Sequence, residues 1–557
     1  MSNLLSIKNL CVHFKTQDLY VKALKGISFS IEKGESLGVV GESGSGKSVT
    51  ALSLMRLLAQ PPAEITQGEI LFHKEDLLKK SEKQMRKVRG NQISMIFQEP
   101  MTSLNPVFTI GYQIDEALIL HQNMSQKIAR EKSIELLNQV GIVGPKERVN
   151  SYPHELSGGQ RQRALIAMAI ACKPQLLIAD EPTTALDVTI QKQILQLLKK
   201  IQQEMNMSIL FISHDLAVIS QIAQRVLVMQ KGEIVEEGLT SKIFKNPKKN
   251  YTKGLIACRP TLEIQTSRLP MISDFQEGKE IKLPLKEKKE FKGEILIKVV
   301  NLSKHFPLKK SFFGKSVSII KAVDKVSFEV EKGSTLGLVG ESGCGKTTLG
   351  RTILQLTQSS GGDVFYKDIN LSKISKRKLK LMRRKMQIIF QDPYASLNPR
   401  MTVGSSIMEP MLIHNLYSSK TERVERVEYL LEQVGLKKDM IHRYPHEFSG
   451  GQRQRICIAR AISIKPEFIV CDESVSSLDV SIQAQILNLL KDLQEKLNLT
   501  YIFISHDLAV VKFISDKVAV MKEGKIVEYK DSNELYTRPE NPYTHKLLES
   551  IPSISFS

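Results

Sequence analysis

Short apolar runs that end in glycine or in acidic residues recur along the chain. Two of them, ESLGVV and STLGLV, predict buried strands, because each is followed by a glycine-rich turn and then by a helix with apolar residues on one face. Two others, QLLIADE and EFIVCDE, end in paired carboxylates, as buried strands of a parallel sheet do. SILFISHD and TYIFISHD predict a further strand of that sheet. The pattern therefore predicts an α/β fold with a parallel-sheet core.

The runs come in pairs because the chain of 557 residues repeats itself once. FISHDLAV stands at 211–218 and again at 503–510, an offset of 292. A period of this length indicates a duplicated domain rather than a solenoid of short repeats. We predict a first domain at 1–262, a linker at 263–293 and a second domain at 294–557. The linker is rich in lysine and glutamate and shows no sustained apolar period, which predicts a solvated, flexible segment; the alternative is a surface excursion of the first domain.

Two glycine-rich loops, GESGSGKS and GESGCGKT, fit the pattern G-x-x-x-x-G-K-[ST] of a phosphate-binding P-loop. Glycine lets the backbone curl so that N–H groups point at phosphate oxygens, and the following helix adds the positive end of its dipole. Lys47 and Lys346 are predicted to bridge the β- and γ-phosphates, and Ser48 and Thr347 to ligate Mg²⁺. A glycine turn that fits by chance is disfavoured because the pattern occurs twice. The remaining loop residues predicted to bind the nucleotide are Gly41, Ser43, Gly44, Gly46, Gly340, Ser342, Gly343, Gly345 and Thr348.

Paired carboxylates end the second predicted strand of each copy. Asp180 and Asp472 suit a Mg²⁺ position held largely through water, and Glu181 and Glu473 suit the group that orients and polarises the attacking water. An adjacent acidic pair alone is more often a solvated loop, but here it follows a buried strand downstream of a P-loop.

A histidine follows the third predicted strand of each copy, at His214 and His506. A lone histidine is more often a core or surface residue. These two lie where the ligands of a parallel sheet gather, at the carboxyl ends of its strands, which favours a contact with the γ-phosphate.

Along nearly its whole length the chain resembles the ATP-binding subunits of ABC transporters. The deciding motifs are LSGGQ at 156–160 and FSGGQ at 448–452, which match the signature sequence of that family. Two glycines at the start of a helix leave N–H groups open for a phosphate; a turn that merely caps the helix is the alternative. The resemblance implies tandem P-loop NTPase domains, each with a parallel-sheet core, a helical signature subdomain and an antiparallel β subdomain. It also implies ATP as the nucleotide and two composite sites formed head to tail between the halves.

The resemblance assigns roles to further residues. Signature residues close over ATP held by the opposite P-loop, Q-loop glutamines sense Mg²⁺ and water, and one aromatic ring per copy stacks on adenine. Asp187 and Asp479 match the loop that couples the two sites. Both sites are predicted to hydrolyse ATP, although Ser474, where the first copy has Pro182, is expected to loosen its turn. The residues with these roles are Ser157, Gly159, Gln160, Ser449, Gly451 and Gln452 in the signatures, Gln98 and Gln391 in the Q-loops, and Phe14 and Phe306 at adenine.

The segments QEPMTSLNPVFTIG and QDPYASLNPRMTVG, with NPKKNYTKGL and RPENPYTHKLL, resemble the di/oligopeptide and nickel importer subfamily. The chain looks like two of its ATPase subunits fused, as in glutathione-type importers. The resemblance implies two transmembrane permease subunits and a solute-binding protein as partners. It also implies a peripheral location on the cytoplasmic face of the inner membrane. Some relatives carry a cysteine cluster after these segments, but only Cys258 is present here, so no iron–sulfur centre is predicted.

The net charge of +20 keeps a second hypothesis open, a soluble tandem ABC ATPase that acts on ribosomes or nucleic acid. No aromatic–basic RNA-binding module is visible and the linker mixes glutamate with lysine, so the importer is favoured and no nucleic-acid partner is expected. A catalytically silent binding module is disfavoured because both glutamates are present. No apolar run approaches the roughly 20 residues of a membrane-spanning helix, and the N-terminus lacks a secretory pattern. The six scattered cysteines predict a reduced, intracellular protein.

Overall fold

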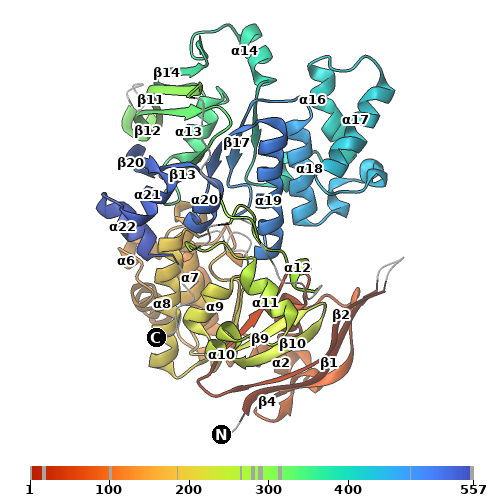
Figure 1. The fold of residues 1–557 in the computed structure, drawn as a ribbon. Coiled ribbons are helices and arrows are strands. Elements are labelled where there is room, and N and C mark those ends of the chain that lie inside the picture. The colour runs from red at the N-terminus through yellow and green to blue at the C-terminus, as the bar shows by residue number, and fades with distance from the viewer. Residues whose placement is uncertain are drawn as a thin grey trace. The chain divides into compact units, whose positions relative to one another are not determined.

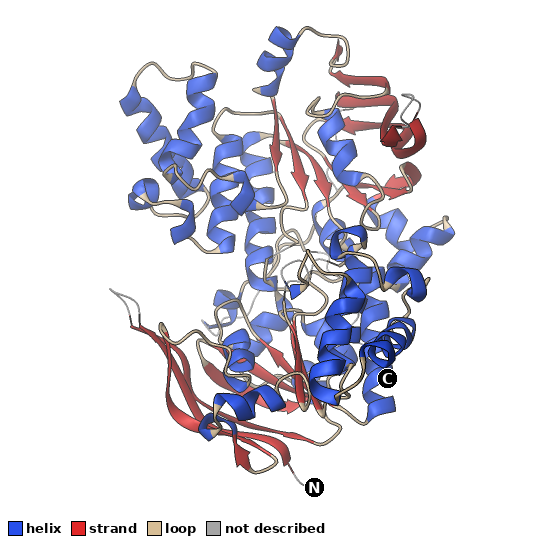
Figure 2. Ribbon diagram, turned by 180° about the vertical axis from the view of Figure 1, so that it is seen from behind, coloured by secondary structure: helices blue, strands red, loops and turns tan. Residues whose placement is uncertain are grey.

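The computed structural model describes residues 3–15, 20–98, 103–184, 186–263, 266–276, 283–286, 293–310, 316–476 and 478–551. The chain divides into two compact units (Figure 1). The first consists mainly of Met1–Ile256, and the second of Ala257–Asp274 and Lys279–Ile551. In each unit, helices flank one sheet, and a separate group of strands forms another (Figure 2).

The core of the first unit is a six-stranded sheet in the order β10-β9-β3-β8-β7-β6. Its strands are parallel except for β10, which pairs antiparallel with β9 at one edge. The strands β3, β7 and β8 are buried along their whole length, which explains why they are continuously apolar rather than alternating. The bounds are β3 (Ser36–Val40), β6 (Ile93–Ile96), β7 (Leu176–Asp180), β8 (Ser208–Ile212), β9 (Arg225–Gln230) and β10 (Glu233–Leu239).

A four-stranded antiparallel sheet in the order β2-β1-β4-β5 packs against this core. Apolar residues of β1 and β4, such as Leu5 and Ile70, belong to the same buried cluster as Leu176 and Ile178 of the parallel sheet. The bounds are β1 (Asn3–Lys15), β2 (Tyr20–Glu32), β4 (Ala63–Phe72) and β5 (Glu75–Asp76).

The helices of the first unit include a packed group, α4, α5 and α7, in which each helix contacts the other two. This group is the helical subdomain that carries the signature residues. The bounds are α1 (Lys47–Leu54), α2 (Glu82–Val88), α4 (Ile110–Gln122), α5 (Gln126–Gln139), α6 (Pro145–Arg148), α7 (Gly158–Ile170), α8 (Val188–Met205), α9 (Leu216–Ile222), α10 (Thr240–Lys245) and α11 (Asn250–Ala257), with 3₁₀ turns at Leu77–Lys79 and Pro153–Glu155.

The second unit repeats this architecture, with sheets in the orders β16-β17-β18-β13-β19-β20 and β12-β11-β14-β15. The predicted fold class is therefore confirmed in both copies. The strand bounds are β11 (Ile295–Lys310), β12 (Ser316–Glu331), β13 (Thr335–Val339), β14 (Gly361–Tyr366), β15 (Ile369–Asn370), β16 (Met386–Ile389), β17 (Phe468–Asp472), β18 (Thr500–Ile504), β19 (Lys517–Lys522) and β20 (Lys525–Asp531). The helix bounds are α12 (Ile272–Gln276), α13 (Lys346–Ile353), α14 (Lys376–Arg383), α15 (Pro393–Ser396), α16 (Val403–Ile413), α17 (Lys420–Gln433), α18 (Gly450–Ile462), α19 (Val480–Leu497), α20 (Leu508–Ile514), α21 (Ser532–Thr537) and α22 (Pro542–Glu549), with 3₁₀ turns at Lys438–His442 and Pro445–Glu447.

Part of the predicted linker packs on the second unit. Leu269 is 1% exposed and lies in the same hydrophobic cluster as residues of α19 and α20. Its backbone is paired with the side chain of Asn488 on α19 through two hydrogen bonds of 2.9 Å. These residues are packed rather than solvated. Other parts of the linker, residues 264–265, 277–282 and 287–292, lie outside the described residues, and the predicted domain boundaries stay predictions.

Candidate functional site

The two P-loops curl between a buried strand and a helix, β3 and α1 in the first unit and β13 and α13 in the second. Glycine is required where each helix begins. Gly46 has a φ of 106° and Gly345 has a φ of 109°, and residues with a side chain rarely adopt such values. A Cβ atom at Gly345 would also lie 2.0 Å from the carbonyl oxygen of Ala322. The loop can therefore fold this way only with glycine at these positions.

A buried lysine lies inside each loop. The Nζ atom of Lys47 donates to the carbonyl oxygens of Gly41 at 2.8 Å and Glu42 at 2.9 Å. In the second unit the corresponding distances from Lys346 are 2.7 and 2.9 Å. Both side chains are about 95% buried, so each ammonium group brings a positive charge to the loop where phosphate groups are predicted to bind.

The P-loop hydroxyl and the first acidic residue of each copy are hydrogen-bonded. Ser48 donates to Asp180 at 3.2 Å, and Thr347 donates to Asp472 at 2.7 Å. Burial raises the pKa of Asp180 to about 6, with a further increase from Glu181, although Ser48 and Lys47 act in the opposite direction. Burial raises the pKa of Asp472 as well. Among the described residues, the buried Oδ2 atom of Asp472 has no hydrogen-bond partner.

The second acidic residue, Glu181, lies in a strained turn immediately after β7. Its φ of 49° is unusual for a residue other than glycine, and its N–H donates to the carbonyl oxygen of Ile212 on the neighbouring strand β8. Glu473 repeats both features, with a φ of 45° and a hydrogen bond to Ile504. The turn is thus retained in the second copy, where Ser474 replaces proline. Strain of this kind concentrates at functional sites.

Three side chains converge on the carboxylate of Glu181. Gln98 donates to Oε2 at 3.2 Å and Thr184 donates to it at 2.9 Å, while Nδ1 of His214 lies 3.1 Å from the same atom. Burial alone would raise the pKa of Glu181, but the hydrogen bond and charge of His214, together with Thr184 and Lys47, lower it to about 2. The group is therefore a carboxylate at neutral pH and is able to accept a hydrogen bond.

The second copy has a corresponding cluster around Glu473, in which the glutamine lies closer to the carboxylate and the histidine lies farther away. Gln391 donates to Oε2 at 2.6 Å, but Nδ1 of His506 lies 3.7 Å from Oε1. Ser476, which corresponds to Thr184, donates to the backbone carbonyl oxygen of Glu473 at 2.9 Å instead of to its carboxylate. Burial would raise the pKa of Glu473, but His506 and Lys346 lower it. The two copies therefore share the glutamate, glutamine and histidine, but they differ in the histidine contact and in the hydroxyl contact.

The signature residues lie at the exposed beginnings of α7 and α18. Ser157 accepts from the N–H of Gln160 at 3.3 Å, and the Gln160 side chain accepts from the N–H of Ser157 at 3.0 Å. Ser449 and Gln452 form the same reciprocal cap. This arrangement presents the N-terminus of each helix to the surface, as a phosphate-binding role requires.

The two aromatic residues predicted to stack on adenine differ in exposure. Phe306 is 40% exposed and Nζ of Lys304 lies 4.9 Å from its ring centre, whereas Phe14 packs partly against the core of the first unit. Phe306 is therefore the more exposed of the two rings, and both assignments stay predictions.

The largest difference from the sequence predictions concerns residues that support the site. Thr184 is not among the residues predicted from the sequence, but its hydroxyl contacts Glu181. Its position three residues after the glutamate is the sequence signal that points to this contact. Tyr251 and Tyr543 contact the P-loops from 209 and 202 residues away, respectively, and no local spacing reveals that pairing. The residues predicted from the P-loop, Q-loop, acidic and histidine motifs are otherwise brought together within each unit.

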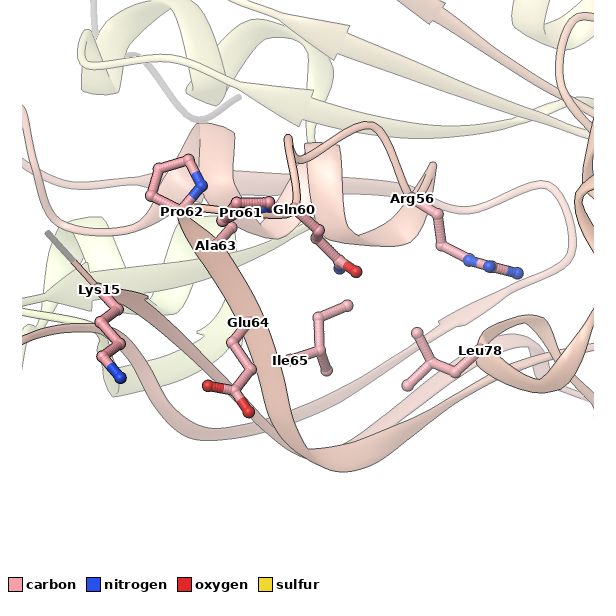
Figure 3. A pocket seen from close by; sticks show the side chains of 9 residues that line it. All are labelled: Lys15, Arg56, Gln60, Pro61, Pro62, Ala63, Glu64, Ile65 and Leu78. Carbon is pink, nitrogen blue, oxygen red and sulfur yellow. The ribbon is translucent and has the colours of Figure 1, made fainter.

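A cavity of about 520 Å³ lies in the first unit away from this cluster (Figure 3). It is formed at the beginning of β4, with Lys15 at one end and Arg56 at the other. Arg56 donates to the carbonyl oxygen of Leu77 at 3.2 Å, so its guanidinium group already has a structural partner. The residues that line the cavity are Lys15, Arg56, Gln60, Pro61, Pro62, Ala63, Glu64, Ile65 and Leu78, and they include none of the predicted site residues.

Two family models match the chain, and the first of them covers the P-loop, the Q-loop glutamine and the acidic pair of each copy. The model described as ABC transporter matches residues 24–184 and 323–476. The chain belongs to the ABC transporter family. The model described as oligopeptide/dipeptide transporter, C-terminal region, matches residues 235–282 and 527–557. No helix among the described residues of this ABC protein is long and apolar enough to cross a membrane.

Several glutathione import ATP-binding proteins are similar to this ABC protein over nearly its whole length. The glutathione import ATP-binding protein GsiA of Escherichia coli O157:H7 is 50% identical over 560 residues, covering 99% of this chain and 90% of the relative. GsiA of Escherichia coli strain K12 is 49% identical with the same coverage. GsiA of Pectobacterium atrosepticum is 47% identical over 556 residues, covering 98% and 89%. The predictions of a tandem ABC ATPase and of ATP as its nucleotide are confirmed.

Proposed function

We propose that this ABC ATPase is the motor of a membrane importer for peptides or related small solutes. The observation that carries the proposal is the match of the oligopeptide/dipeptide transporter C-terminal region to both copies. The relatives whose names refer to glutathione import support it. Two transmembrane permeases and a solute-binding protein are the proposed partners, and the proposed location is peripheral, on the cytoplasmic face of the inner membrane. The alternative of a ribosome or nucleic-acid factor is not favoured.

The residues of each cluster fit a Mg²⁺–nucleotide. Oδ2 of Asp472 is a buried carboxylate oxygen without a hydrogen-bond partner in the described part of the chain, and a hydrated Mg²⁺ satisfies such an atom. The hydroxyl of Thr347 lies beside the same carboxylate. Ser48 and Asp180 form the corresponding pair in the first copy. When bound, Mg²⁺ neutralises charge on the β- and γ-phosphates. The proposed Mg²⁺-holding residues are Ser48, Gln98, Asp180, Thr347, Gln391 and Asp472.

The chain's own residues suggest how hydrolysis proceeds. Lys47 would exchange its loop carbonyl partners for phosphate oxygens and keep the nucleotide in the P-loop. Glu181, ionised and held by His214 and Thr184, would accept a hydrogen bond from the attacking water and orient it in line with the γ-phosphate. Gln98, which donates to the same carboxylate, lies in the loop proposed to face the permease. Loss of the γ-phosphate would therefore be sensed at both the glutamate and the Q-loop.

The experiment that tests the proposal is affinity purification from gently solubilised native membranes, with mass spectrometry of the co-purifying proteins. The expected result is recovery of two multi-span permeases and a solute-binding protein. The double variant Lys47→Ala, Lys346→Ala is the control, because it tests whether association with these partners depends on ATP binding. Recovery of ribosomes without any permease would overturn the importer and leave the ATPase chemistry intact.

A further inference from the structure

A tyrosine hydroxyl contacts each P-loop from the C-terminal part of the same unit. The N–H of Glu42, the second residue of the first loop, donates to the hydroxyl of Tyr251 on α11 at 3.3 Å. In the second unit the N–H of Glu341 donates to the hydroxyl of Tyr543 on α22 at 3.1 Å. The same contact thus forms twice, although the flanking sequences, NPKKNYTKGL and RPENPYTHKLL, differ at most other positions.

The contacted residue is also a partner of the P-loop lysine. The carbonyl oxygen of Glu42 accepts from Lys47 at 2.9 Å, and that of Glu341 accepts from Lys346 at 2.9 Å. The backbone of Glu42 is therefore held from both sides, by the tyrosine at its N–H and by the lysine at its carbonyl. A substitution that removes either hydrogen bond is therefore expected to change the conformation of the loop, whose carbonyl oxygens the lysine must release before it can bind a phosphate.

A buried glutamate fixes the turn that precedes each tyrosine. Glu236 on β10 accepts from the N–H groups of Lys248 and Lys249 at 2.8 and 3.2 Å. Glu528 on β20 accepts from the N–H groups of Glu540 and Asn541 at the same two distances. Both carboxylates are more than 90% buried. A continuous connection therefore runs from the sheet edge through the turn and the short helix to the P-loop.

We infer that Tyr251 and Tyr543 are positioning residues for ATP binding, which act by holding the second residue of each P-loop in the conformation that receives the phosphates. This inference rests on the proposed nucleotide site. It gives a role to the segments matched by the transporter C-terminal region, residues 235–282 and 527–557, within the ATPase cycle. In Figure 1, α22, which carries Tyr543, lies beside α21 and β20, and β20 is the strand that carries Glu528.

The test replaces each hydroxyl with hydrogen and keeps the ring, in the double variant Tyr251→Phe, Tyr543→Phe of the full chain. A neutral hydrogen bond contributes about 0.5–1.5 kcal/mol, so the Kd and KM for ATP are expected to rise about three- to tenfold while kcat stays within about twofold. Kd is measured with a fluorescent ATP analogue and by competition with ATP, and kcat and KM by phosphate release.

Tyr536→Phe is the matched control, because Tyr536 lies on the neighbouring helix α21 and its hydroxyl donates to the carbonyl oxygen of Leu508 on α20 at 2.6 Å. This control is expected to lower the melting temperature without changing the Kd for ATP. Glu236→Gln, Glu528→Gln is a second variant that weakens the turn and leaves the tyrosines in place; it is expected to raise the Kd in the same direction. Unchanged Kd and KM in the folded tyrosine double variant would overturn the inference. Failure of the unaltered chain to bind ATP would instead overturn the nucleotide site itself.

Discussion

The Nδ1 atom of His214 lies 3.1 Å from Oε2 of Glu181, whereas the corresponding atoms of His506 and Glu473 lie 3.7 Å apart. The first distance is within hydrogen-bonding range and the second is beyond it. The histidine and the glutamate are therefore within hydrogen-bonding distance in the first copy and beyond it in the second. This difference leads us to expect unequal contributions from the two histidines.

The His214→Ala variant is expected to lower kcat for ATP hydrolysis by roughly 10- to 100-fold, because a hydrogen bond to a charged group contributes about 1.5–3 kcal/mol. His506→Ala is expected to have a smaller effect, since its ring is not hydrogen-bonded to Glu473. Both values are measured at saturating ATP and Mg²⁺. Equal losses in the two variants would show that the difference in distance disappears when nucleotide binds.

The acidic residues proposed to orient water are tested by Glu181→Gln, Glu473→Gln. The amide keeps the shape of the side chain but is a poor base, so hydrolysis should fall by about 10²- to 10⁴-fold. Because Lys47 and Lys346 are unchanged, the Kd for ATP should stay within about threefold. Phosphate release and ATP binding are measured on the same preparation, and undiminished hydrolysis would exclude the assignment.

The hydroxyl of Thr184 is expected to support the first site alone. It donates to the carboxylate of Glu181, whereas Ser476 donates to a backbone carbonyl oxygen. Thr184→Val removes the donor at nearly constant volume and should reduce kcat by about tenfold, in line with the loss of a hydrogen bond to a charged group. Ser476→Ala is the matched control and should change kcat by less than twofold. A similar loss in both variants would contradict the asymmetry.

The sequence predicts the catalytic cluster because its parts follow three strands that are neighbours in the sheet. β3, β8 and β7 lie side by side, so the P-loop, His214 and Glu181 reach the same edge. Apolar runs, turn glycines and terminal carboxylates encode this arrangement locally. The contact between Tyr251 and Glu42 is not encoded locally, because it joins segments 209 residues apart. The packing of Leu269 is hidden for a different reason: one buried apolar residue lies within a segment whose average composition is that of a solvated coil.

That packing yields a prediction about stability. Asn488 is 3% exposed and satisfies both the N–H and the carbonyl oxygen of Leu269. Asn488→Ala leaves both buried groups without their partner, so the free energy of unfolding of the second unit should fall by about 1–3 kcal/mol. The ion pair between Arg268 and Asp492, at 3.3 Å, is exposed to solvent, so it is not expected to compensate for this loss of stability.

The control is Gln196→Ala, which alters the corresponding and exposed position on α8 and should change stability by no more than about 0.5 kcal/mol. Chemical denaturation gives the stability, and limited proteolysis shows whether cleavage near Leu269 becomes faster. Faster cleavage in Asn488→Ala alone would demonstrate that this segment is held on α19 in solution. Equal cleavage rates in both variants and the unaltered chain would mean that the asparagine does not hold it, because removing a real anchor must increase the time that the segment spends detached.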